Sequence, residues 1–134
     1  MPGGVRIEIC LRGEDTEGAF CMLVDEPPVG WSLPAHLHRD AAETIHVLEG
    51  SFEMEVEGAR SLLSTGDTLH VPRGKVHSGG NIGSKPGRRL VIFSPAGMEQ
   101  LFLEVGASEP GTGIDPAEAL ASAVRHGWEF VAPG

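Results

Sequence analysis

The sequence has few basic side chains, two cysteines and no long apolar run, and these shortages exclude several classes of protein. Its 10 Lys and Arg residues stand against 19 Asp and Glu, a formal net charge of −9 that repels nucleic acids and anionic membranes. No apolar stretch is long enough to span a bilayer, and residues 1–4 lack the basic and apolar character of a secretory leader. We therefore expect a cytoplasmic protein with no nucleic-acid or membrane partner. At 134 residues, the chain suits a single domain, residues 1–134, that buries a core without disulfides.

Turn-forming residues are abundant instead. The 19 glycines and 10 prolines are spread without a fixed period, which is typical of turns between many short strands. Alternation of apolar and polar residues predicts an all-β protein, and within it Phe52, Met54 and Val56 should face the interior. A bend at Pro72–Gly74 should start a new strand that carries His77. The expected strands cover residues 5–12, 19–24, 44–48, 52–57, 61–64, 68–71 and 90–93, and the glycine-rich residues 79–87 are expected to form a loop.

The last third of the chain has apolar residues at helical spacing. This pattern predicts two short helices, one over residues 97–105 and one over residues 115–126, with Asp115 as the N-cap of the second and Gly127 after its end. An apolar helix face left in water would be unfavourable, so we expect this C-terminal extension, residues 97–134, to pack against the β-domain, residues 5–96. The packing residues would be Met98, Leu101, Phe102, Val105, Leu120 and Val124.

The two cysteines lie at equal distances from the turn around Asp15 and Thr16. If the first hairpin is symmetric about that turn, Cys10 and Cys21 face each other across it. Such a pair can form a disulfide under oxidation, but in the cytoplasm two reduced thiols are expected.

Two histidines and a glutamate lie close together in the segment from Gly30 to Gly50. Successive side chains of a strand point to opposite faces, so His36 and His38, two residues apart, lie on the same face. Glu43 is an odd number of residues further on. It reaches the same side only if the chain turns or bulges through residues 39–42, which are polar or small. The segment thus offers three potential metal ligands.

Two spaced patterns contain these residues. The first reads G-x5-H-x-H-x4-E-x6-G from Gly30 to Gly50, and the second reads G-x5-P-x-G-x2-H-x3-N from Gly66 to Asn81. Together they resemble the two sequence motifs of the cupin family, over roughly residues 20 to 100, with every fixed position filled. The resemblance implies a jelly-roll barrel, the double-stranded β-helix, which would carry the two short C-terminal helices. It also implies that His77 is the fourth metal ligand.

We therefore expect His36, His38, Glu43 and His77 to bind one divalent transition metal, with Glu43 also the catalytic residue. Three imidazoles and a carboxylate accept Fe, Mn, Ni, Co, Cu or Zn, so the sequence leaves the metal's identity open. For His46, His70 and His126, an ordinary surface or core position is the expected role. Asn81 is expected to cap the next loop or to support a ligand. An apolar wall around the metal is expected from Trp31, Phe52, Met54, Phe93 and Phe102, although each of these also suits ordinary core packing.

Three functions stay open at this point. The segment from Ser94 to Glu99, followed by Phe102, is similar to single-domain cupins of the quercetin-dioxygenase-like group, which implies a metal-dependent dioxygenase-like oxidoreductase acting on a small enolic or phenolic molecule. A non-redox isomerase, decarboxylase or lyase would use the same ion as a Lewis acid. A small-molecule binding module without turnover is the third. We further expect a homodimer, because unpaired strand edges need covering.

Overall fold

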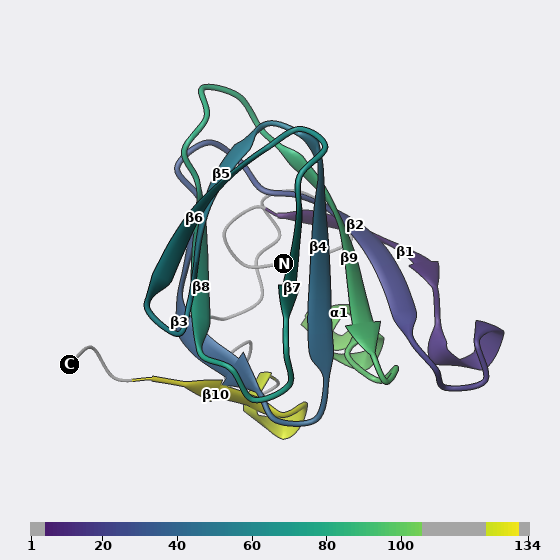
Figure 1. Cartoon of the computed structure of the whole chain (residues 1–134). Helices are drawn as coiled ribbons and strands as arrows, with labels where there is room; N and C mark the ends of the chain where they lie inside the picture. The colour runs from purple at the N-terminus through teal and green to yellow at the C-terminus, as the bar shows by residue number, and fades with distance from the viewer. Residues whose placement is uncertain (1–4, 106–122, 132–134) are drawn as a thin grey trace.

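The computed structural model describes residues 5–105 and 123–131. Two five-stranded antiparallel sheets face each other (Figure 1). The first has the order β1-β2-β9-β4-β7 and the second the order β10-β3-β8-β5-β6. This arrangement confirms the all-β jelly-roll prediction. The strands of the first sheet are β1 (Arg6–Leu11), β2 (Cys21–Glu26), β9 (Arg88–Ser94), β4 (Ala42–Glu49) and β7 (Thr68–Val71), and those of the second are β10 (Trp128–Phe130), β3 (Ser32–His38), β8 (His77–Asn81), β5 (Ser51–Val56) and β6 (Ala59–Ser64).

Alternating side chains of both sheets fill the space between them. On β4, Ile45 and Val47 are buried while Thr44 and His46 are more exposed, as the two-residue period of a strand requires. Phe52 and Met54 on β5 are buried as predicted, whereas Val56 is only half-buried at the end of that strand. His77 opens the new strand β8 after the bend at Pro72–Gly74, also as predicted.

The predicted pairing of the two cysteines is wrong. Ile9 pairs with Leu23 and Leu11 with Met22, and the register shifts between them, so Cys10 lies in a bulge with no partner across the ladder. The hairpin is asymmetric because a short 3-10 helix, η2 (Gly13–Asp15), follows β1 directly. In a strand, a shift of one residue exchanges the two faces. Cys10 is consequently exposed and Cys21 buried, and both thiols are free.

Residues 79–81, predicted to belong to a loop, continue strand β8. Gly79 pairs with Met54 of β5, and a Cβ atom on Gly79 would lie 2.5 Å from the Met54 sulfur. A side chain at this position would force the flexible Met54 side chain to move, so Gly79 allows close packing inside the sheet and does not form the turn expected of the glycines in this segment. The loop begins after Asn81. As expected, the Asn81 side chain caps it, donating to the Pro27, Pro28 and Lys85 carbonyls and accepting from the Gly83 N–H.

The first predicted helix is present as α1 (Glu99–Val105), and it packs against the first sheet (Figure 1). Met98, Leu101 and Phe102 join the core cluster, which confirms the packing expected of them. Most of the second predicted helix lies outside the described residues, as does Leu120; residues 123–125 are helical. Val124 is 50% exposed, so its predicted packing is wrong: in this short helical segment its neighbour Ala123 faces the core instead.

The short strand β10 follows this helical segment and was not predicted. It pairs antiparallel with β3, with Trp128 opposite His38 and Phe130 opposite His36. It extends the second sheet beside the strand that carries two of the candidate metal ligands. Among the helices of the described ranges, none has the length and apolar character needed to cross a membrane.

Candidate metal site

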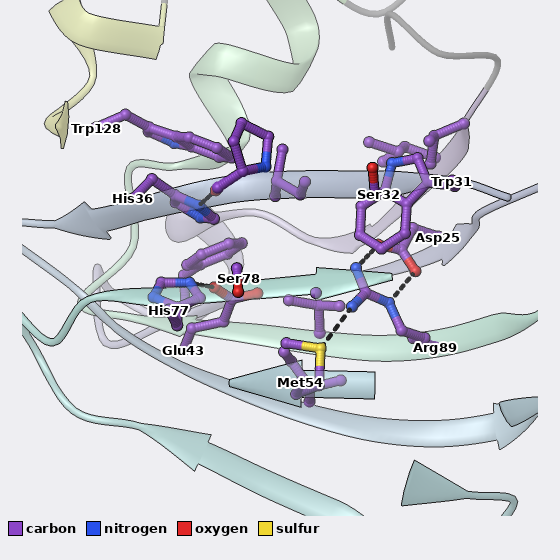
Figure 2. A pocket seen from close by; sticks show the side chains of 18 of the residues that line it. Asp25, Trp31, Ser32, His36, Glu43, Met54, His77, Ser78, Arg89 and Trp128 are labelled. Carbon is purple, nitrogen blue, oxygen red and sulfur yellow. Dashed lines mark hydrogen bonds and ion pairs between the residues drawn. The ribbon is translucent and has the colours of Figure 1, made fainter. Parts of the chain in front are cut away.

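The four predicted ligands come together between the two sheets. His36 and His38 lie on β3, and His77 on β8 pairs directly with His36 in the ladder. Glu43 projects from β4 in the opposite sheet, and the turn through Arg39 and Asp40 brings the chain from one sheet to the other. Figure 2 shows Glu43 and His77 next to each other, with His36 above them. The expected turn after His38 therefore exists, and it carries Glu43 to the opposite wall of the same interior.

The geometry of the cluster is tight. One ring nitrogen from each of His36, His38 and His77 lies within 4.8 Å of the others, and all three residues are buried. The Glu43 Oε1 atom lies 3.1 Å from Nε2 of His38 and 3.2 Å from Nε2 of His77. Three nitrogen donors and one oxygen donor thus surround a common point.

Backbone carbonyls fix which nitrogen of two rings is available. Nδ1 of His36 donates to the Pro34 carbonyl at 2.8 Å, and Nδ1 of His77 donates to the Lys75 carbonyl at 3.0 Å. A carbonyl oxygen can only accept, so each Nδ1 carries the hydrogen and Nε2 of the neutral ring keeps its lone pair. This is the usual way in which a protein orients a metal-binding imidazole. The donor set therefore fits a divalent transition metal.

The charges of the site follow from burial and from the ion pairs. Burial disfavours the carboxylate of Glu43, but hydrogen bonds from His38 and His77 outweigh it and hold the Glu43 pKa well below its ordinary value. Burial lowers the pKa of His77 while the hydrogen bond and charge of Glu43 raise it, and the net effect is a raised pKa. Burial and the charge of His77 lower the pKa of His36 to about 4. Glu43 is therefore ionised and His36 neutral, whereas His77 is protonated more readily than an ordinary histidine, so a metal ion would have to displace the proton on its Nε2.

Sequence reasoning missed Trp128, which covers this cluster. Its indole stacks on the His36 ring at a centroid distance of 4.5 Å with 9° between the planes, and it meets the His38 ring edge-on at 4.6 Å. Its Nε1–H points at the Met98 sulfur, 2.9 Å away. Only the brief alternation after Gly127 signals this strand in the sequence, and three residues are too few to predict one.

A cavity of about 480 Å³ adjoins the cluster and is lined mainly by apolar side chains. Of the predicted wall residues, Trp31, Met54, Phe93 and Phe102 line it, whereas Phe52 does not and belongs to the core. The same cavity reaches His36, Glu43 and His77. The candidate metal ligands therefore form part of the wall of a pocket suited to a small organic molecule.

Sequence reasoning also missed a buried ion pair in this cavity. Arg89 of β9 and Asp25 of β2 pair across the ladder, and the guanidinium binds the carboxylate with two hydrogen bonds of 2.9 Å and 2.6 Å. Burial opposes the charge of Arg89, but Asp25 outweighs it and raises the Arg89 pKa. Leu23 and Asp25 share one face of β2, and Arg89 and Val91 share one face of β9, but both charged residues lie just beyond the strands that alternation predicted, residues 19–24 and 90–93.

The remaining histidines are not part of the cluster. His46 and His70 lie on β4 and β7, where their Nδ1 atoms are hydrogen-bonded with the hydroxyls of Thr68 and Thr44, as expected of ordinary sheet residues. His126 follows the helical segment at residues 123–125, and the three-histidine cluster does not include it.

Comparison with known proteins agrees with this architecture. The chain is 32% identical over 113 residues to quercetin 2,3-dioxygenase of Bacillus subtilis (strain 168), covering 84% of this chain and 33% of that protein. It is 31% identical over 120 residues to germin-like protein 1-1 of Oryza sativa subsp. japonica, covering 84% of this chain and 54% of the relative. It thus spans about a third to a half of the length of these curated relatives.

A solved structure shares the fold. KdgF from Halomonas sp. superposes with a TM-score of 0.65 at 22% identity, over 72% of this chain and 84% of that one. Residues 22–93 match the sequence profile of the family described as "Cupin domain". The profile match covers more than half of the sequence, and so the chain belongs to the cupin family.

Proposed function

We propose that His36, His38, Glu43 and His77 bind one divalent transition metal, and that the protein is a metal-dependent dioxygenase-like enzyme acting on a small enolic or phenolic molecule. The observation that carries the proposal is the convergence of three imidazole nitrogens and a carboxylate on the wall of a largely apolar cavity. The ligand set accepts Fe, Mn, Ni, Co, Cu or Zn.

When bound, a metal ion would supply Lewis acidity that lowers the pKa of an enol or phenol oxygen, and a redox-active ion would also supply a route for electrons towards dioxygen. The residues of the chain supply the rest. Carbonyl groups of Pro34 and Lys75 hold His36 and His77 in the required tautomer. Glu43 contributes a negative charge and, as the proposed catalytic residue, an oxygen that can accept the proton of an enol or phenol. The apolar side chains of Ile45 and Phe93 limit the access of water.

The comparisons support the class of reaction that this proposal names. The name of the Bacillus subtilis relative describes a dioxygenase acting on quercetin, a phenolic molecule, and the match covers 84% of the present chain. Because the match covers only 33% of that relative, we extend to this chain only the class of reaction and the phenolic or enolic character of the substrate.

A non-redox isomerase, decarboxylase or lyase is the second candidate. It is favoured by the position of Glu43, whose carboxylate lies within hydrogen-bonding distance of two imidazoles and can move a proton without any oxidant. A small-molecule binding module without turnover is the third. The homodimer and the cytoplasmic location remain predictions.

One reconstitution experiment separates these candidates. Apoprotein is loaded in turn with Fe, Mn, Ni, Co, Cu or Zn, and oxygen uptake is measured with flavonols, diketones and catechols. Uptake with redox-active ions only, abolished by Glu43→Ala, supports the dioxygenase-like enzyme. Isomerisation or decarboxylation without uptake supports the non-redox enzyme, and ligand binding without conversion supports the binding module.

The metal ligands are tested separately by elemental analysis. We expect the double variant His36→Ala/His77→Ala to lose its metal, because it removes two of three nitrogen donors. The double variant His46→Ala/His70→Ala is the matched control, since it removes two histidines outside the cluster. Equal metal content in both double variants contradicts the assignment.

A further inference from the structure

Arg89 occupies the cavity at some distance from the metal cluster along its length. Figure 2 shows its guanidinium between Trp31 and Met54, to the right of the group formed by Glu43 and His77. The Arg89 residue is only 5% exposed, yet it lines the cavity together with the candidate metal ligands. Burying the charge of an arginine costs free energy unless an acidic group pairs with it. The contacts of Arg89 therefore determine which groups of a ligand it can bind.

Asp25 uses only part of the hydrogen-bonding capacity of this arginine. A guanidinium has five N–H bonds, and Asp25 accepts from Nε and from Nη2. The Nη1 group faces the Met54 sulfur at 3.9 Å, a weak acceptor at a long distance. N–H groups of Nη1 and Nη2 therefore remain available to donate to a ligand in the cavity.

The orientation of the guanidinium is fixed before any ligand binds. Its central carbon lies 4.9 Å from the centroid of the Trp31 ring and 5.3 Å from that of Phe52, both within the range of cation–π contacts. The two hydrogen bonds to Asp25 hold the plane of the group. A hydrogen bond to a ligand would thus cost little side-chain entropy.

The charge balance narrows the kind of group that Arg89 can bind. Asp25 already neutralises the positive charge of Arg89, so the ion pair does not require a negatively charged group on the ligand. Glu43 and His77 line the same cavity as Arg89, so one small ligand can contact both parts of it. A neutral or partly charged oxygen acceptor suits the arginine, and an anionic oxygen suits the metal.

We propose that Arg89 is a specificity-determining residue, which donates a hydrogen bond to a carbonyl or phenolic oxygen at the end of the substrate remote from the three-histidine cluster. Asp25 is its positioning residue. This inference rests on the proposed function, which assigns the other end of the substrate, an enol or phenol oxygen, to the metal. The substrate class is thereby a small apolar molecule with oxygen functions at two opposite ends.

Two catechols of nearly equal size test the inference without turnover. Both 3,4-dihydroxyacetophenone and 4-ethylcatechol carry a catechol diol, but only the first has a carbonyl oxygen at its other end. The acyl group also makes the diol more acidic, so the contribution of Arg89 is read from how far the preference falls in the variants below. We expect zinc-loaded wild-type protein to bind the acetophenone at least about tenfold more tightly by calorimetry, as one hydrogen bond to a charged donor predicts. Equal affinities for the two catechols overturn the role of Arg89 and leave the metal site standing.

The preference is then measured in variants. Arg89→Met combined with Asp25→Leu removes both charges, so that neither is left buried without its partner. We expect this variant to keep its zinc and its affinity for 4-ethylcatechol within about twofold, and to show a preference for the acetophenone about tenfold smaller than that of the wild type, since the Arg89 donor is gone. Arg89→Lys keeps the charge but loses the planar fork, and should show a reduced preference; it serves if the double variant does not fold.

Arg88→Met combined with Glu26→Leu is the matched control, because this neighbouring ion pair is half-exposed. We expect it to retain the wild-type preference. An unchanged preference in the Arg89 variants overturns the inference alone. Failure of both catechols to bind the zinc-loaded wild type, or failure of zinc itself to bind, overturns the proposed function, and the inference with it.

Discussion

Trp128 provides the sharpest test of how the site is built. It is 5% exposed, and its indole covers the His36 ring from strand β10, which reaches the site from the far end of the chain. Trp128→Ala removes that ring and leaves a void beside His36 and His38. The perturbation thus affects both the core and the orientation of two candidate metal ligands.

The buried contacts of Trp128 set the expected loss of stability and of metal affinity. Truncation of a buried tryptophan to alanine destabilises a domain by about 3–5 kcal/mol. In a chain of this size each kcal/mol shifts the melting temperature by roughly 3–5 °C, so we expect the melting temperature of the variant to fall by about 10–25 °C. Loss of a group that orients a metal-binding histidine lowers metal affinity by about 10–100-fold.

Thermal melts followed by circular dichroism, with a chelator and then with zinc, measure the two effects separately. Phe130→Ala is the control on the same strand: Phe130 is 40% exposed, so its loss should shift the melting temperature by only a few degrees, about a third of the Trp128 effect or less. A Trp128→Ala melt within about 3 °C of wild type in chelator would show that the indole does not close the core. Unchanged zinc affinity would show that it does not orient His36.

Two further predictions concern residues away from the cluster. Burial and the nearby charge of Glu99 raise the pKa of the Cys21 thiol to about 11, whereas Cys10 is exposed. Iodoacetamide at pH 8 should therefore alkylate the native chain at Cys10 only, and at both thiols after denaturation; labelling of native Cys21 at a comparable rate would contradict its burial. Asn81→Ala leaves the carbonyls that its side chain binds without donors and should reduce the free energy of unfolding by about 2–3 kcal/mol in urea titration, while a change below about 0.5 kcal/mol would mean that water replaces the side chain.

The sequence predicted most of the site because its ligands lie in short patterns of fixed spacing. His36 and His38 follow from strand parity, and the polar turn after them explains how Glu43 reaches the same interior from the opposite sheet. The register of the hairpin that carries Cys10 and Cys21 was mispredicted because no short sequence pattern encodes it. Its register depends on a bulge and a 3-10 turn, which local alternation does not reveal, and a shift of one residue exchanges inside for outside.

Contacts between distant parts of the chain could not be predicted in this way. Strand β10 has three residues, and its pairing with β3 is a tertiary contact that no local pattern announces. Arg89 and Asp25 stood on inward positions of their strands, but a charged residue in a strand is ordinarily assigned to the outer face. Only their pairing across the ladder makes burial of both favourable.

The division of the four candidate ligands between two sheets also has a mechanical consequence. Three of them belong to β3 and β8, and Glu43 alone belongs to the facing sheet. An ion held by all four would join the two layers directly, so the layers could not separate before the Glu43 contact broke. At a free ion concentration a hundred times the dissociation constant, such binding adds about 2.7 kcal/mol to the free energy of unfolding. Amide hydrogen exchange in β4 and β3 would then slow together as the ion concentration rises, which makes the metal supply of the cell a determinant of how often the barrel opens.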